Sequence, residues 1–297
     1  MIIIDLSGGL GNQMFQFALY KKLISLGKDV YLDASSYSDM DSFRKLELLQ
    51  YKGIKRSDLR LTNDYEQAPD FISRISFITK RWLLKRIGIR YEDKIGVFQP
   101  EVFDLNWAYL SGYWQNEKFF VDIREDILRT FSFEESDVDV VNKEYTKSMQ
   151  EEQSVSLHVR RGDYLDPKCQ KVYGGICTVK YYRNSVKYIC EHVEKPSFYV
   201  FSDDLPWVRD NIDNLMGEVA KSCDIHYVDH NAGDKSFLDI YLMSQCKYHI
   251  IANSSFSWWG AWLGANEDKI VVAPSRWFAN HDTSDVVCDD WVRMNRE

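Results

Sequence analysis

The feature that most constrains this chain is a regular alternation of short apolar segments and amphipathic segments over residues 154–275. The apolar segments are rich in β-branched and aromatic residues, which is typical of buried strands. The segments between them carry apolar residues at helical spacing. Because strands that alternate with helices fold into a parallel sheet covered by those helices, we predict an α/β fold. Its last strand is expected at residues 269–275.

The first 35 residues repeat this organisation. An apolar strand at residues 1–6 is followed by a glycine-rich loop, by a helix that ends at Gly27, and by a strand at residues 28–33. Residues 134–153 are polar and rich in charge, which fits a domain boundary. We therefore predict two Rossmann-like domains, residues 1–150 and 151–297, with ligands at the carboxyl ends of the strands.

Composition narrows the class of protein. The chain has 297 residues, is 45% hydrophobic and carries a formal net charge of −8, which argues against a nucleic-acid partner. The start lacks the features of a secretory signal, and no run of about 20 apolar residues is present. The six cysteines form no C-x-x-C pair. We expect reduced thiols and a cytoplasmic location.

Residues 71–90 form an amphipathic segment with several Lys and Arg residues and no acidic residue. One interpretation is a surface helix of the first domain. The other is peripheral contact with an anionic membrane, at the inner face of the plasma membrane. The sequence leaves both open.

Polar side chains gather at the ends of three predicted strands in the second domain. They are His158, Arg160, Arg161 and Asp163 at the first strand, Ser202, Asp203 and Asp204 at the next, and Asn253, Ser254 and Ser255 at a third. Because the carboxyl ends of parallel strands meet at one edge of a sheet, these side chains are expected to form one site.

The chemistry of these residues suits a nucleotide diphosphate. Guanidinium groups such as Arg160 and Arg161 bind phosphate oxygens in pairs, and a helix that starts after Asn253 directs backbone N–H groups at an anion. An ordinary capped helix is the alternative for the latter segment. Asp203 and Asp204 could accept hydrogen bonds from guanine or a ribose, or could begin a helix.

The glycine-rich loop of the first domain partly matches a dinucleotide fingerprint. Gly9 and Gly11 fit the first two glycines of G-x-G-x-x-G, but Met14 stands where glycine or alanine is needed. An NAD(P)-dependent enzyme is therefore the weaker alternative. The glycines more readily allow close approach of a ligand, with Asn12 and Gln13 offering amides to sugar hydroxyls.

Two short patterns are given less weight. Asp137 and Asp139 form a D-x-D, which holds a metal ion in some glycosyltransferases, but they lie in the charge-rich boundary, where a solvated charge run is the better interpretation. Residues 161–163 spell the adhesion tripeptide RGD, the basis for a binding module rather than an enzyme.

Five blocks in order resemble the bacterial α-1,2-fucosyltransferase family: GGLGNQMFQFA at 8–18, GYWQNEKFF at 112–120, HVRRGDY at 158–164, FSDD at 201–204 and NSSFSWWGAWL at 253–263. The resemblance implies a GT-B fold, with two Rossmann-like domains facing across a cleft. It also implies GDP-fucose as donor, inversion at the fucose anomeric carbon and no metal or other cofactor.

The resemblance also implies roles for residues. Arg160 and Arg161 would hold the pyrophosphate, with backbone donors from Ser254, Ser255 and Phe256. His158 would orient this cluster, Asp203 or Asp204 would bind guanine, and Asp239 would support the site. Ser202 and Asn253 complete the donor set, while Gly9, Gly11, Asn12 and Gln13 would face the sugar and the acceptor. Arg160, Asp163 and Asn12 are the catalytic candidates; Asp163 would be the base or would fix an arginine, and the leaving phosphate could take the proton instead.

The expected reaction is transfer of L-fucose to the 2-hydroxyl of a terminal galactose, with formation of an α-1,2 linkage. The acceptor would be a galactose-terminated oligosaccharide or lipid-linked glycan, as in O-antigen biosynthesis. Transfer from another GDP-sugar is the alternative within this class of enzyme.

Overall fold

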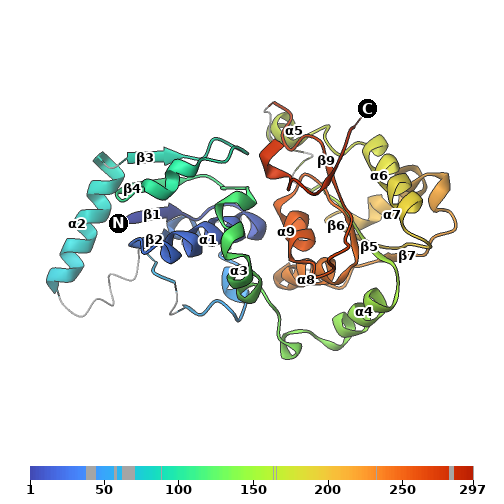
Figure 1. Cartoon of the computed structure of the whole chain (residues 1–297), viewed down its shortest axis with the longest axis horizontal. Coiled ribbons are helices and arrows are strands. Elements are labelled where there is room, and N and C mark those ends of the chain that lie inside the picture. Colours follow the sequence, from blue (N-terminus) through green and yellow to red (C-terminus); the bar gives the residue numbers. More distant parts are fainter. Residues whose placement is uncertain are drawn as a thin grey trace. The chain divides into compact units, whose positions relative to one another are not determined.

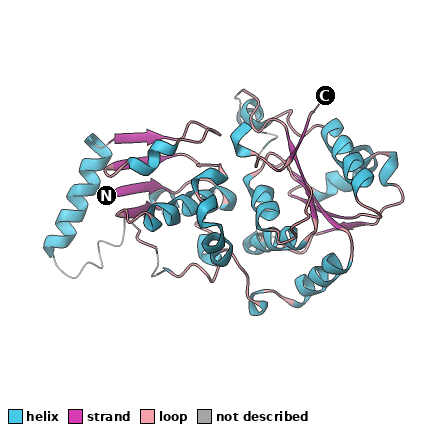
Figure 2. Ribbon diagram, viewed as in Figure 1, coloured by secondary structure: helices cyan, strands magenta, loops and turns pink. Residues whose placement is uncertain are grey.

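The computed structural model describes residues 1–37, 45–56, 59–61, 71–87, 89–162, 164, 166–231, 233–280 and 284–296. The chain divides into two compact units, Met1–Ser132 and Phe133–Glu297. Each unit is built on one parallel sheet with helices, which confirms the predicted α/β class and the pair of Rossmann-like domains (Figures 1 and 2). These units differ from the predicted domains in the placement of residues 133–150.

The first unit holds a four-stranded sheet in the order β2-β1-β4-β3. Its strands are β1 (Ile2–Asp5), β2 (Val30–Asp33), β3 (Ile89–Glu92) and β4 (Ala108–Ser111), and its helices are α1 (Leu10–Ser25), α2 (Phe71–Ile87) and α3 (Arg124–Thr130). Helix α1 connects β1 to the parallel β2 and buries Met14, Phe15 and Leu19. Gly27, with φ of 74°, ends this connection in the left-handed conformation that glycine adopts without strain.

The second unit holds a six-stranded parallel sheet in the order β10-β9-β8-β5-β6-β7. Its strands are β5 (Ser154–Val159), β6 (Ser197–Ser202), β7 (Ile225–Tyr227), β8 (Tyr248–Ile250), β9 (Val271–Pro274) and β10 (Val292–Met294). Counted from β5, this is the strand order of a dinucleotide-binding Rossmann sheet. The expectation that the last strand lies at residues 269–275 is wrong, because β10 follows it and pairs with β9.

Helices cover both faces of this second sheet. They are α4 (Val140–Glu151), α5 (Pro167–Tyr173), α6 (Val179–His192), α7 (Leu205–Met216), α8 (Phe237–Gln245) and α9 (Ser255–Leu263). Successive residues of β6 alternate between faces. Phe198 and Val200 pack with residues of α6 and α7, whereas Tyr199 and Phe201 pack with residues of α4 and α8. The apolar strands predicted from the sequence are therefore buried on both sides.

The charge-rich boundary segment contains helix α4, and Asp139 of the D-x-D is its N-cap residue, whereas Glu134, Glu144 and Glu151 are exposed. The Asp139 carboxylate accepts a hydrogen bond from the backbone N–H of Asn142 at 3.0 Å, which caps α4, and forms an ion pair with Lys235 at 3.1 Å. These contacts lower the pKa of Asp139 to about 2. The D-x-D aspartate thus has a structural role at the start of a helix.

Two further expectations concern the whole chain. The six cysteines carry free thiols. Within the described ranges, no helix combines the length and the apolar character needed to cross a bilayer.

Candidate functional site

The residues predicted from three strand ends meet at the point where the strand order of the second sheet reverses. The chain runs from β5 outward to β6 and β7, and then returns to the other side of β5 with β8. In an open parallel sheet, ligands bind outside the carboxyl ends of the strands at this reversal. Arg160 and Arg161 follow β5 directly, and Asn253 lies shortly after β8.

An arginine–aspartate cluster occupies this edge. Arg160 Nη1 lies 3.0 Å from Asp203 Oδ2, and Arg161 Nε lies 3.1 Å from Asp204 Oδ2. Asp203 Oδ1 accepts a hydrogen bond from the backbone N–H of Arg161 at 2.9 Å, and Asp204 Oδ1 accepts one from Trp207 at 3.3 Å. Each of the four carboxylate oxygens of Asp203 and Asp204 therefore contacts either a guanidinium group or a backbone N–H group. The geometry shows the aspartates positioning the arginines, whereas recognition of guanine stays a prediction.

Gly162 allows this cluster to form. A Cβ atom at this position would lie 2.4 Å from Asp203 Oδ2, which is a steric clash. The glycine in HVRRGDY therefore permits the carboxylate of the neighbouring strand end to approach the backbone.

Aromatic rings lie under the two guanidinium groups. The Cζ atom of Arg161 is 3.5 Å from the centroid of the Trp207 ring, and that of Arg160 is 5.7 Å from the Tyr164 ring. Each guanidinium group therefore contacts one carboxylate and one aromatic ring. The positive groups are therefore positioned before any ligand binds.

His158 lies beneath this cluster, at the end of β5. Its side chain is only 4% exposed, and burial, followed by the charge of Arg160, holds its pKa well below the ordinary range. The imidazole is therefore neutral near pH 7. Its ring centroid is 6.0 Å from that of Phe256, so the predicted residues of β5 and α9 do come together.

Helix α9 begins directly after β8, with Ser254 as its N-cap residue. The Ser254 backbone is extended, yet its hydroxyl makes no capping hydrogen bond. The side chain therefore does not take the position at which an anion meets the first N–H groups of a helix, Ser255 and Phe256 among them. Buried Trp258 and Trp259 fix this helix against the unit.

Asn253 fixes the segments around the site. Its Nδ2 donates to the backbone oxygens of Tyr173 and Trp277 at 3.2 and 3.1 Å, and its Oδ1 accepts from Cys177 Sγ at 3.4 Å. The hydroxyl of Tyr164 donates to the backbone oxygen of Asn253 at 2.7 Å. The side chain is 2% exposed, and Asn253 positions the site through these three side-chain contacts and one backbone contact.

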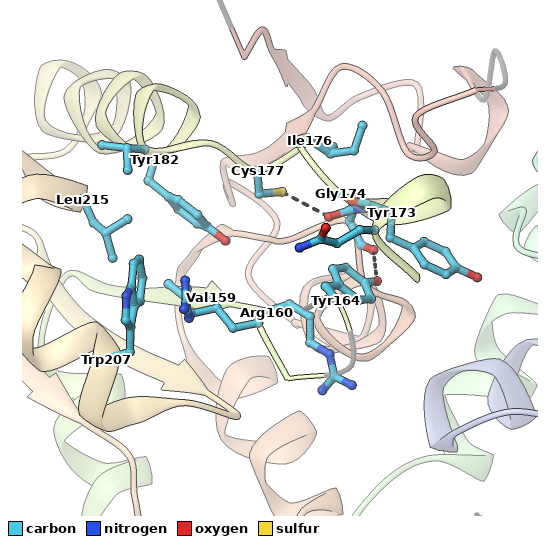
Figure 3. Close-up of a pocket in the computed structure, with 15 residues that line it drawn as sticks. Val159, Arg160, Tyr164, Tyr173, Gly174, Ile176, Cys177, Tyr182, Trp207 and Leu215 are labelled. Carbon is cyan, nitrogen blue, oxygen red and sulfur yellow. Dashed lines mark hydrogen bonds between the residues drawn. The ribbon is translucent and has the colours of Figure 1, made fainter. Parts of the chain in front are cut away.

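A cavity of about 550 Å³ opens at this edge, within the usual size range of small-ligand sites. Of the predicted residues, Arg160, Arg161 and Asn253 line it. Figure 3 shows Trp207, Tyr182 and Leu215 on one side of the cavity and Tyr164 and Tyr173 on the other, with Arg160 between them. The stacked rings of Tyr164 and Tyr173 have centroids 5.0 Å apart.

The aromatic lining is the part that the sequence analysis missed. Tyr164 lies inside the HVRRGDY block, and Trp207 follows Asp204 by three residues, so a signal existed for both. Tyr173 and Tyr182 lie in segments with no distinctive pattern, and only the fold brings them to the cavity.

Asp239 lies in the first turn of α8 and belongs to a different polar group. Its Oδ1 accepts a hydrogen bond from Asn231 Nδ2 at 2.9 Å, and Asn231 also donates to Asn142 Oδ1 at 2.8 Å. Burial raises the pKa of Asp239 to about 7, and the hydrogen bond from Asn231 opposes this only in part. Its predicted support of the donor site stays a prediction.

The raised pKa of Asp239 has a measurable consequence. A carboxyl group whose pKa rises from 3.8 to about 7 on folding stabilises the fold below pH 4, and this stability is lost as the pH rises through 7. Between pH 4 and pH 7 the free energy of unfolding of the wild type should therefore fall relative to that of Asp239→Asn. We expect this difference to reach about 2 kcal/mol, because residual solvent contact weakens the effect of burial. Urea unfolding at several pH values measures this difference. A difference that does not change with pH would contradict it.

The predicted sugar-facing loop lies in the first unit, where Gly9 is the N-cap residue of α1 and Gly11 lies in its first turn. Gln13 is fully buried; its Nε2 donates to the backbone oxygens of Gly8 and Lys45, and its Oε1 accepts from Glu47. Asn12 Oδ1 accepts from Gln115 at 2.7 Å. The Gln13 amide therefore holds the loop, and sugar contact by this loop stays a prediction.

Asp163, the candidate base, lies outside the described residues. Ser202 supports the cluster, since its hydroxyl accepts the backbone N–H of Asp204 at 3.0 Å.

The chain is 31% identical to an alpha-1,2-colitosyltransferase of Escherichia coli over all of this chain and 99% of that protein. It is 33% identical to the O-antigen biosynthesis glycosyltransferase WbnK of Escherichia coli, over 97% and 99% of the two chains. It is 29% identical to human galactoside alpha-(1,2)-fucosyltransferase 1, over 55% of this chain and 45% of that one.

Among solved structures, a mutant of Arabidopsis thaliana FUT1 in complex with GDP is similar at a TM-score of 0.48 and 13% identity, over 93% of this chain and 71% of that one. The family model of glycosyl transferase family 11 matches residues 90–295, which include the whole arginine–aspartate cluster and helix α9. The resemblance carried by the five sequence blocks is thereby confirmed. This chain belongs to glycosyl transferase family 11.

Proposed function

We propose that this glycosyltransferase moves L-fucose from GDP-fucose to the 2-hydroxyl of a terminal galactose and inverts the anomeric carbon to form an α-1,2 linkage. The observation that supports it most is the cavity at the strand reversal. Two positioned guanidinium groups, Arg160 and Arg161, line it, and helix α9 begins beside it without a side-chain cap. This combination suits a diphosphate with an attached nucleoside.

The proposed mechanism follows the charge of the leaving group. As the bond between fucose C1 and the phosphate oxygen breaks, negative charge grows on the β-phosphate. Arg160, Arg161 and the first N–H groups of α9 stabilise that charge, because they are held in place beforehand. The acceptor hydroxyl attacks from the opposite face of the sugar and releases its proton to a base, for which Asp163 or the departing phosphate is proposed. The residues supply the charge stabilisation, so we propose that no metal is needed.

A second donor has specific support. The colitosyltransferase of Escherichia coli matches this chain along its whole length. Colitose is fucose without the 3-hydroxyl group, so a site for one of these sugars is close in shape to a site for the other. GDP-colitose is therefore the alternative donor within the same reaction.

The decisive experiment incubates the chain with GDP-fucose, or with GDP-colitose, and a panel of β-1,3- and β-1,4-linked galactosides. We expect GDP release with GDP-fucose and an α-1,2 linkage in the product. A higher kcat/KM with GDP-colitose would show that GDP-colitose is the donor. The absence of transfer from either donor to any galactoside would contradict the proposal.

Ligand binding and metal removal test the donor site separately. GDP at one hundred times its Kd should raise the free energy of unfolding by about 2.7 kcal/mol, whereas NAD should not raise it. We also expect EDTA to leave turnover unchanged. A strict requirement for Mn²⁺ would contradict the metal-independent mechanism, and stabilisation by NAD alone would contradict the nucleotide assignment.

A further inference from the structure

Helix α2 has an apolar stripe that faces away from its own unit. Ile75, Ile78 and Trp82 are 48%, 45% and 55% exposed. At 3.6 residues per turn, their spacing places them within an arc of about 60°. Leu84 is 0% exposed and lies roughly on the opposite side of the helix. The helix therefore packs through Leu84, and the stripe is left to the outside.

The charge of α2 is the opposite of that of the chain. Its sequence holds five Lys and Arg residues and no acidic residue, although the whole chain has a net charge of −8. Arg86 is exposed and lies about 50° from the centre of the stripe, and its guanidinium lies 5.2 Å from the centroid of the Trp82 ring. Long basic side chains beside an apolar stripe can reach phosphate head groups while the apolar side chains enter the lipid interface.

This charge argues against a symmetric contact between two copies of the chain. Such a contact would bring two α2 helices with five basic residues each against one another, and like charges would repel. An anionic surface satisfies the apolar stripe and the basic residues together. In Figure 1 the strands of the first sheet point away from α2, so the helix lies away from their carboxyl ends.

We propose that α2 docks this enzyme on an anionic lipid surface. The helix lies in the plane of the membrane, with Ile75, Ile78 and Trp82 in the interface and with Arg86 among the head groups. This places a glycosyltransferase at the surface where a lipid-linked acceptor would be found. Docking depends on α2 alone and holds whichever sugar the enzyme transfers.

The test is co-sedimentation of the full chain with vesicles of phosphatidylcholine that contain about one third phosphatidylglycerol. We expect binding to these vesicles and about ten-fold weaker binding to phosphatidylcholine alone. Salt at about 1 M, which shortens the screening length to about 3 Å, should release most of the protein. Equal binding to both vesicles, or no binding to either, would overturn the proposal.

Variants separate the stripe from the rest of the surface. The triple change Ile75→Ser, Ile78→Ser and Trp82→Ser should lower the partition coefficient about ten-fold or more. The matched control is Ile24→Ser with Leu26→Ser, two residues of the same unit that are 40% and 43% exposed; it should bind as the wild type does. Equal loss in both variants would overturn the role of α2.

The charge arm compares variants of equal net charge. Arg86→Glu should weaken the preference for anionic vesicles, whereas Lys55→Glu, also at an exposed position, should retain most of it. All variants should keep the wild-type kcat/KM on an acceptor that is free of lipid, which shows that they are folded. Activity without vesicle binding would therefore overturn docking alone, and binding without activity would overturn the proposed reaction alone.

Discussion

Replacing Arg160 with alanine should lower kcat for sugar transfer by about 10²- to 10³-fold, the usual effect of removing one positioned group that stabilises a developing charge. Arg160 lines the cavity, and its guanidinium is fixed by Asp203 at 3.0 Å and by the Tyr164 ring. Because this group is expected to act on the leaving phosphate, its loss should affect the transition state more than ground-state binding. Steady-state kinetics with GDP-fucose measure both parameters.

The matched control is Arg209→Ala. Arg209 also pairs with a carboxylate, Asp229 at 2.8 Å, and also lies over a ring, that of Tyr227 at 4.2 Å, but it is exposed and belongs to the outer part of α7. This variant should retain near wild-type activity. Arg160→Lys should fall between the two, because an ammonium group keeps the charge without the planar fork. Activity within a few fold of wild type in Arg160→Ala would refute the role of Arg160.

Trp258→Ala should destabilise the second unit by about 5 kcal/mol. Trp258 is 0% exposed, and its ring packs against those of Trp259, Trp262 and Trp291, with centroids 5.0, 6.0 and 5.5 Å away. Its Nε1 donates to the backbone oxygen of Val286 at 2.8 Å. Removing a buried tryptophan costs about 3–5 kcal/mol, and the buried oxygen left without this donor adds about 1–3.

Circular dichroism during urea unfolding measures this loss, with the transition of the second unit expected to shift. Trp82→Ala is the control, because Trp82 is 55% exposed and its removal in the absence of lipid should cost less than about 1 kcal/mol. Similar losses in the two variants would contradict the assignment of Trp258 to the core that holds α9.

The sequence by itself determined the class of fold and the position of the site at one edge of the second sheet. Strands such as β5 and β6 are visible as apolar runs, and the helices between them are visible through their spacing, because both periods are properties of neighbouring residues. A parallel sheet then requires that His158, Arg160 and Asn253 lie at one edge. The five ordered blocks predicted the family, and the match of the glycosyl transferase family 11 model to residues 90–295 confirms it.

The tertiary structure alone decided which of these residues touch. It paired Arg160 with Asp203 and Arg161 with Asp204, placed Trp207 and Tyr164 under the guanidinium groups, and committed the Gln13 amide to its own loop. It also showed Asp139 as a helix cap and added β10 to the sheet edge. The contacts of Arg161 with Asp203 and Asp204 join residues 42 and 43 positions apart and depend on strand order, whereas a local pattern reports only a residue's own segment.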